Sequence, residues 1–204
     1  TMISHRIGRV MPQAPEAMAR GDFMVARDLA NRVTEGAPVF MDGWMMLSEA
    51  LAELDQYAEG MAALDAAMEF HPDALPLRVQ RCKFLLGLGR RKECLEQASE
   101  LLPGVGEDPW AMDMLAMYLS ILEQVDDAAT LYEALCRMEP GNPENQVNLG
   151  MARLAQGRLQ EARVCAESAL DMSPGLPRAL SLLANLRTAT ADDNRVDSLK
   201  TALM

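Results

Sequence analysis

The sequence is poor in aromatic residues, which bears on the fold class. Phe, Trp and Tyr make up 4% of the 204 residues, whereas 16 are methionines and hydrophobic residues amount to 50%. Strands favour aromatic and β-branched side chains, while Ala, Leu and Met favour helices, so a β-sandwich is not expected. A hydrophobic share of one half supports a buried core, which argues against a disordered chain.

Positive charge is also in short supply. Lys and Arg total 19 against 30 Asp and Glu, which leaves a net charge of −11. An excess of negative charge repels a phosphate backbone, so we expect no nucleic-acid partner. The sequence contains no apolar run of the roughly 18 to 20 residues that cross a bilayer, so we expect no membrane insertion.

Cysteine is scarce, and no two cysteines form a CxxC pair. Cys82, Cys94, Cys136 and Cys165 are spread along the chain, which does not suit a disulfide scaffold and favours packing as small apolar side chains. The first residues lack the apolar core of a secretory signal. We therefore expect a cytoplasmic protein, although a chain whose signal had been removed would begin in the same way.

Residue patterns that carry chemistry are missing. The two histidines are His5, near the start, and His71, before a proline, and no HExxH, GxSxG, Walker loop or GxGxxG occurs. The acidic pair Asp126-Asp127 stands where a helix is expected to begin, and carboxylates there cap free N–H groups. We predict no catalytic residue, no cofactor and no metal ligand in this chain.

The chain does contain an internal repeat of 34 residues. Prolines stand at Pro38, Pro72, Pro140 and Pro174, and residues suited to end a helix recur with the same step. A small residue at two positions of each repeat would let two helices approach closely. The helix-ending residues are Gly21, Asp55, Gly89, Glu123 and Gly157, and the small residues are Ala14, Ser48, Cys82, Ala116, Gly150 and Ala184, with Ala26, Gly60, Cys94, Ala128 and Ala162.

This repeat resembles the tetratricopeptide repeat, a 34-residue helix–turn–helix unit with the pattern W-x2-L-G-x2-Y…A-x3-F…P. The segments from Trp44 to Pro72 and from Leu149 to Pro174 both follow the pattern. The resemblance implies an all-α fold, a right-handed superhelical solenoid of helix–turn–helix repeats. It places a tail at residues 1–6 and a single array at 7–204, with units 7–40, 41–74, 75–108, 109–142, 143–176 and a partial 177–204.

Two places depart from the pattern. Pro103 arrives early in its unit, so we expect a shortened second helix there and a longer connection over residues 104–109. Pro12 and Pro15 stand where the first helix of the first unit should run, so that helix should start near Pro15 and be short.

The end of the sequence predicts a further amphipathic helix. Asp192 suits its N-cap, and Val196, Leu199 and Leu203 are spaced to share one apolar face. Because the sequence then stops on an apolar residue, we expect that the native chain continues past Met204.

In the family that the repeat resembles, the first helices of successive units line a concave groove. Solvated helix faces are usually charged, whereas the groove positions here are mainly Met, Val, Leu, Ile and Trp, which suggests a ligand. Flexible methionines suit an amphipathic helix or an apolar peptide. The positions are Met45, Glu49, Glu53, Val79, Lys83, Leu86, Trp110, Asp113, Met117, Ile121, Val147, Met151, Leu154, Ser181 and Asn185.

Three functions fit this sequence. The first is a non-catalytic adaptor that holds a peptide or helix of another protein in the groove, unless a terminal helix of the chain itself fills it. The second is the N-terminal region of a longer enzyme, similar to repeat proteins that continue into a sulfotransferase or glycosyltransferase domain. The third is a self-assembling array or homodimer that pairs through its end helices. The strip Trp110, Met117, Val147 and Met151 is the predicted partner site.

Overall fold

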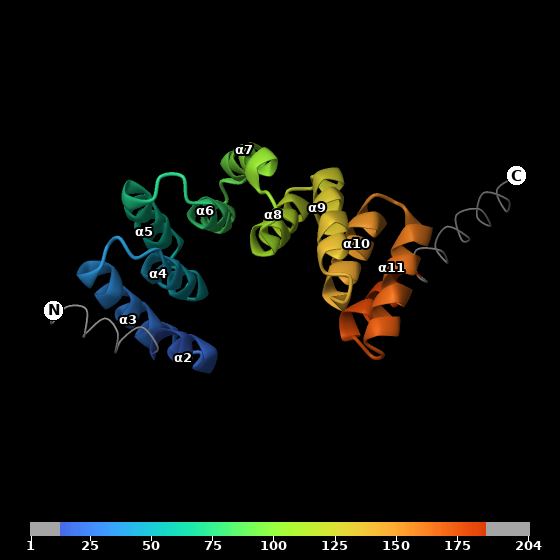
Figure 1. Ribbon diagram of the computed structural model, residues 1–204, viewed down its shortest axis with the longest axis horizontal. Helices are drawn as coiled ribbons and strands as arrows, with labels where there is room; N and C mark the ends of the chain where they lie inside the picture. The colour runs from blue at the N-terminus through green and yellow to red at the C-terminus, as the bar shows by residue number, and fades with distance from the viewer. Residues whose placement is uncertain (1–12, 187–204) are drawn as a thin grey trace, which may run out of the picture. The chain divides into compact units, whose positions relative to one another are not determined.

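The computed structural model describes residues 13–186, and the regular elements in that range are all helices (Figure 1). The predicted all-α fold of helix–turn–helix repeats is confirmed. The helices are α2 (Gln13–Arg20), α3 (Phe23–Gly36), α4 (Met41–Glu53), α5 (Tyr57–Phe70), α6 (Leu75–Gly87), α7 (Arg91–Leu101), the 3-10 helix η1 (Leu102–Gly104), α8 (Pro109–Ile121), α9 (Val125–Met138), α10 (Pro143–Ala155) and α11 (Leu159–Met172), and residues 177–186 are helical as well.

The helix starts follow the 34-residue period. The first helices α4, α6, α8 and α10 begin at residues 41, 75, 109 and 143, and the next begins at 177. The second helices α3, α5, α7, α9 and α11 begin at residues 23, 57, 91, 125 and 159. From α4 onward, each first helix therefore begins at the first residue of a predicted unit.

The contacts divide the chain into two compact parts, which we call the N-terminal part (Thr1–Gly106) and the C-terminal part (Glu107–Met204). Within each part, helices that follow one another in the sequence pack together: α2 to α7 in the first, α8 to α11 in the second. Packing between neighbours is the expected pattern of a repeat protein. The boundary falls inside the irregular connection around residues 104–109.

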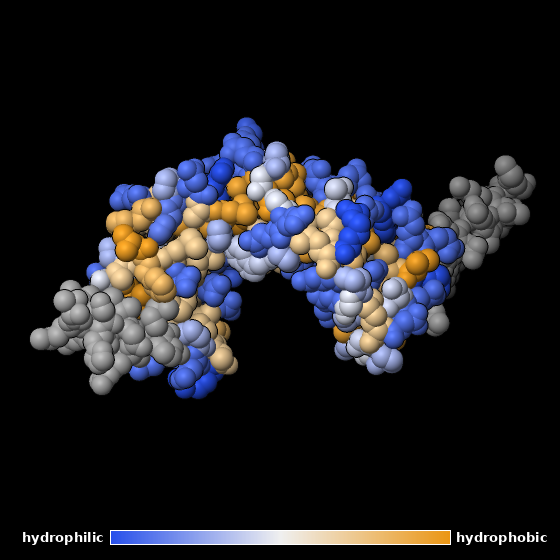
Figure 2. All heavy atoms as spheres, viewed as in Figure 1, coloured by the Kyte–Doolittle hydropathy of each residue, from blue (hydrophilic) through white to orange (hydrophobic). Residues whose placement is uncertain are grey.

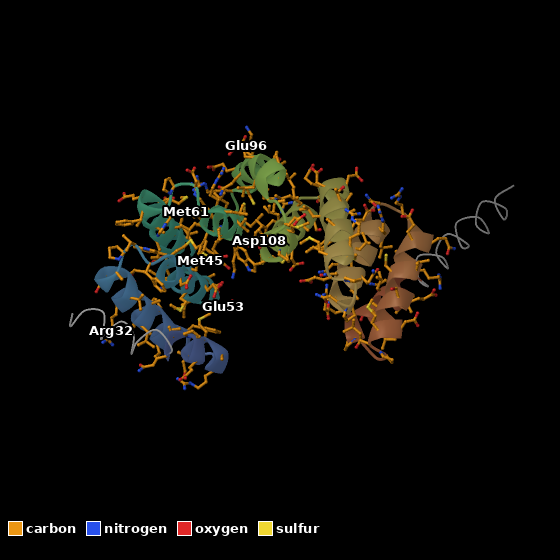
Figure 3. All side chains as sticks on the ribbon, in the orientation of Figure 1. Arg32, Met45, Glu53, Met61, Glu96 and Asp108 are labelled. Atoms are coloured by element: carbon orange, nitrogen blue, oxygen red, sulfur yellow. The ribbon has the colours of Figure 1, made fainter. Side chains whose placement is uncertain are left out.

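That connection begins where α7 ends early. α7 has 11 residues, whereas α3, α5, α9 and α11 each have 14, which confirms the predicted shortening before Pro103. Beyond it, the Asp108 carboxylate accepts a hydrogen bond of 3.1 Å from the Ala111 amide, and Pro109 occupies the first turn of α8 (Figure 3).

Three further predictions concern the two ends of the chain. α2 is helical from Gln13, the first described residue, to Arg20, so the start of the first helix predicted near Pro15 is not tested. The tail at residues 1–6 and the amphipathic segment from Asp192 to the end lie outside the described residues.

The small residues mark the places where helices touch. Ten of the eleven are buried, and Ala184 is exposed. A Cβ added at Gly150 on α10 would lie 2.6 Å from the Leu182 Cδ2 atom and 3.1 Å from the Cys165 Cβ atom. A Cβ at Gly60 on α5 would overlap the ring of Phe84 on α6. These positions are small because a neighbouring helix fills the space of a side chain.

The turns inside the units share one backbone conformation. The five predicted helix-ending residues all have positive φ: +78° at Gly21, +56° at Asp55, +73° at Gly89, +64° at Glu123 and +75° at Gly157. After α8, Glu123 N–H donates to the Ser120 carbonyl and Gln124 N–H to the Leu119 carbonyl, a Schellman pair of hydrogen bonds that the other four turns repeat. Asp55 and Glu123 therefore adopt a conformation that favours glycine.

Gly150→Leu is expected to destabilise the protein by about 1 to 3 kcal/mol, because the new side chain must displace Leu182 and Cys165. Gly141→Leu is the control, since a Cβ there has no heavy atom within 4 Å, and its effect should stay within about 0.5 kcal/mol. Urea unfolding of the three proteins measures this. Equal stability of Gly150→Leu and wild type would show that the contact is not tight.

Glu123→Gly is expected to raise the free energy of unfolding by about 0.5 to 1 kcal/mol, because glycine adopts a left-handed backbone without strain. The reciprocal change Gly157→Ala, at the same turn position one unit later, should lower it by about 1 kcal/mol. Both are measured by chemical denaturation. A loss of stability in Glu123→Gly would contradict the assigned turn geometry.

Candidate functional site

The C-terminal part contains a groove of about 480 Å³ between two first helices. α8 and α10 both pack on α9 and flank the groove, and α9 supplies its floor. On the side shown in Figure 2, hydrophilic residues cover much of α9, α10 and α11, with smaller hydrophobic patches between them. The lining residues are Asp113, Met117, Ser120, Ile121, Val125, Tyr132, Asn148, Met151, Ala152, Ala155 and Arg178.

Three large hydrophobic side chains in the groove are open to solvent. Met117 is 38% exposed, Ile121 47% and Met151 45%. Met117 and Ile121 lie one turn apart on α8, and Met151 occupies on α10 the position of Met117, 34 residues later. Exposed apolar side chains that converge on one hollow are typical of an interaction site.

A polar row crosses the groove beside these side chains. The Asn148 amide donates a hydrogen bond of 3.4 Å to the Asp113 carboxylate. The Arg178 Nη2 atom in turn donates a hydrogen bond of 2.7 Å to the side-chain oxygen Oδ1 of Asn148, and the Arg178 Nη1 atom forms an ion pair with Glu144. Residues of three successive first helices are thereby linked.

Burial raises the pKa of two groups that line the groove, Asp113 and Tyr132. It raises the pKa of the Asp113 carboxyl above its usual value, and the Arg178 charge and the Asn148 hydrogen bond only partly oppose it. Burial also raises the pKa of Tyr132 to about 12, with a further contribution from the Asp113 charge. Tyr132 therefore stays neutral near pH 7 and acts as part of the apolar floor.

A second hollow of about 220 Å³ adjoins the groove. Met151 and Arg178 line both the groove and this second hollow. Its remaining lining residues are Val147, Pro177, Ser181, Leu182 and Asn185.

The structure brings together most of the site residues predicted in the C-terminal part. Asp113, Met117, Ile121 and Met151 line the groove, whereas Val147, Ser181 and Asn185 line the second hollow. Val147 is almost completely buried, Leu154 packs against the buried cluster around Leu182, and Trp110 is exposed outside both hollows.

Sequence reasoning missed seven of the eleven residues that line the groove, among them Tyr132, Asn148 and Arg178. Tyr132 lies on a second helix, and only first-helix positions were considered. Asn148 occupies a first-helix position outside the register used for the prediction, whereas Arg178 occupies the register position of Trp110 two units later and was not among the predicted residues. The signal that would find the last two is their polar character on an otherwise apolar face.

The predicted residues of the N-terminal part form a different surface. Met45, Glu49, Lys83 and Leu86 are half-buried, and Val79 is fully buried. The Lys83 Nζ atom lies 3.9 Å from the Glu53 Oε1 atom. Glu53 is on the same helix as Met45 (Figure 3). Burial raises the pKa of Glu49, Lys83 lowers it and Glu53 raises it further. This face of α4 and α6 therefore contains three charged residues, Glu49, Glu53 and Lys83.

Cys82 and Cys94 pack against each other across α6 and α7. Both are fully buried, and the Cys94 thiol donates to the Cys82 carbonyl at 3.5 Å. The hydrogen bond with Cys94 and burial raise the pKa of the Cys82 thiol well above its usual value. The predicted packing role is confirmed for this pair.

Paired helices that repeat every 34 residues define a helix–turn–helix repeat protein. Residues 11–74 and 121–186 match family models described as tetratricopeptide repeat, and together these matches cover more than half of the chain. The chain belongs to the tetratricopeptide repeat family, as its residue pattern indicated. Proteins of this family are generally non-catalytic repeat scaffolds for other proteins.

Solved structures with the same fold come from several proteins. TTC0263 of Thermus thermophilus is 16% identical, with a TM-score of 0.69, over 91% of this chain and 99% of that one. PilF of Pseudomonas aeruginosa is 14% identical, with a TM-score of 0.72, over 97% and 90%. YrrB, a tetratricopeptide repeat protein with an unusual peptide-binding site, is 15% identical, with a TM-score of 0.62, over 89% and 97%. No curated protein sequence matches the chain.

Between residues 13 and 186, no helix is both long and apolar enough to cross a membrane. Over the same range, no cluster of three or more His, Cys, Asp or Glu side chains is arranged to hold a metal ion.

Cys82 and Cys94 are expected to react with N-ethylmaleimide at least about tenfold more slowly than Cys136 at pH 8, because Cys136 is only half-buried. Mass spectrometry of peptides at successive times measures each rate. In urea all the thiols should react at similar rates. Labelling of Cys82 as fast as that of Cys136 in the native protein would contradict its burial.

Proposed function

We propose that this chain is a non-catalytic scaffold that binds a segment of a partner protein in the groove between α8 and α10. The observation that carries the proposal is the convergence of Met117, Ile121 and Met151, all more than a third exposed, on one hollow of about 480 Å³. Burying these side chains against a ligand would remove apolar surface from water.

The groove suits a short segment in size and in chemistry. A volume of 480 Å³ lies within the usual range for ligand pockets, about 300 to 1,000 Å³, and accommodates a few side chains. Methionines adapt their shape to different apolar partners. The polar row of Asp113, Asn148 and Arg178 lies alongside and offers hydrogen bonds to the backbone or polar side chains of the segment.

The comparison with known structures adds support of a general kind. YrrB, whose fold this chain shares, is itself a peptide-binding protein. The other candidate occupants of the groove are a terminal helix of the chain itself and a second copy of the chain, and either would compete with an added peptide. Both alternatives predict that an added peptide binds weakly or not at all.

Met151→Ser is expected to weaken peptide binding by about tenfold, because it removes a central apolar contact. The peptides are random 12-residue sequences selected by phage display on the full chain, and fluorescence anisotropy gives their affinities. Met138→Ser is the matched control, since Met138 is 39% exposed on α9 outside the groove. It should change affinity less than twofold.

Circular dichroism verifies that both variants keep the wild-type helix content. Peptides that bind Met151→Ser as tightly as wild type would place the binding surface elsewhere. A selection that enriches no peptide would favour a groove already filled by the chain or by a second copy, and sedimentation over a concentration series would separate these two.

A further inference from the structure

Asp113 is the acidic residue among the groove-lining side chains, and its charge is incompletely compensated. The carboxylate is half-buried, and the hydrogen bond that it accepts from Asn148 is long, at 3.4 Å. Burial raises the pKa of this carboxyl, the Arg178 charge and the Asn148 hydrogen bond lower it only in part, and Glu139 raises it further. A partly desolvated carboxylate gains stability when a cation approaches it.

Arg178, the basic residue among the groove-lining side chains, already has an acidic and a polar partner. Arg178 pairs with Glu144 and donates to Asn148, so two of its nitrogens are engaged away from Asp113. The whole chain adds a net charge of −11, which attracts basic segments and repels acidic ones. Both the local and the global charge favour a basic ligand.

Asp113 also lies in line with the apolar side chains of the groove. Asp113, Met117 and Ile121 follow one another at intervals of four residues along α8, which corresponds to about 6 Å each. An extended peptide advances about 3.3 Å per residue. In the ligand, the residue that contacts Asp113 is therefore roughly two residues from the residue that contacts Met117 and roughly four from the residue that contacts Ile121.

We propose that the partner segment carries a Lys or Arg side chain that pairs with Asp113, and apolar side chains two to four residues away that fill the hollow at Met117, Ile121 and Met151. This inference rests on the proposed function, since it specifies which segment the groove selects. The basic side chain supplies specificity, and the apolar side chains supply most of the buried surface.

The test uses the peptides selected by display on the full chain. Sequences that need Met151 for binding should be enriched in Lys or Arg two to four residues from a large apolar residue. For one such peptide, replacing the basic residue by Gln should weaken binding to wild type roughly tenfold. The same replacement should change binding to Asp113→Asn less than twofold, because the charge partner is already gone.

Asp127→Asn is the control for net charge, since Asp127 is an exposed acid in the first turn of α9. It removes the same charge outside the groove lining and should keep the full tenfold discrimination. The discrimination in wild type should shrink as salt is raised from about 50 to about 500 mM, as expected for an ion pair open to solvent.

The outcomes separate this inference from the proposed function. Peptides that need Met151 but show no basic preference, or one that persists in Asp113→Asn, overturn the inference and leave the groove as the binding site. Enrichment of acidic peptides that need Arg178 also overturns it. If no selected peptide depends on Met151, the proposed function fails and the inference fails with it.

Discussion

The close approach of helices at two small residues in each repeat is the constraint on which the rest of the structure depends. Gly150 shows it most directly, because Leu182 and Cys165 fill the space that a side chain would occupy. In the C-terminal part, the first helices α8 and α10 both pack on the second helix α9 that lies between them in the sequence. Their remaining faces are left open beside one another, and the groove between them is a consequence of this packing.

The turns end the first helices at equivalent positions, so that successive units keep the same residue register. The left-handed residue that follows each first helix ends it at the same point, so the first helices keep one length from α4 to α10. Met117 and Met151 therefore lie on equivalent turns of neighbouring helices, and an apolar residue at that position in two successive units forms one surface. The same geometry places charged residues together on α4 and α6, where Glu53 and Lys83 pair.

Much of this could be predicted from the sequence, because a repeat encodes its local contacts many times over. The 34-residue step gave the helix starts, the turn residues and the shortened α7, and the family register gave Asp113, Met117, Ile121 and Met151. The register did not predict that Tyr132 and Arg178 line the groove, because this depends on how far their side chains reach into it from other helices. The register also did not show that Val79 and Val147 are buried, because the exposure of a side chain at one register position depends on the side chains around it.

The measurement that tests the central claim most directly is the methyl NMR spectrum of the full chain, labelled at its methionines, during titration with a selected peptide. If the groove between α8 and α10 holds the peptide, the methyl signals of Met117 and Met151 shift with the same dissociation constant that anisotropy gives, while Met138 stays unchanged. Shifts confined to methionines outside the groove, with Met117 and Met151 unaffected at saturation, would contradict the account.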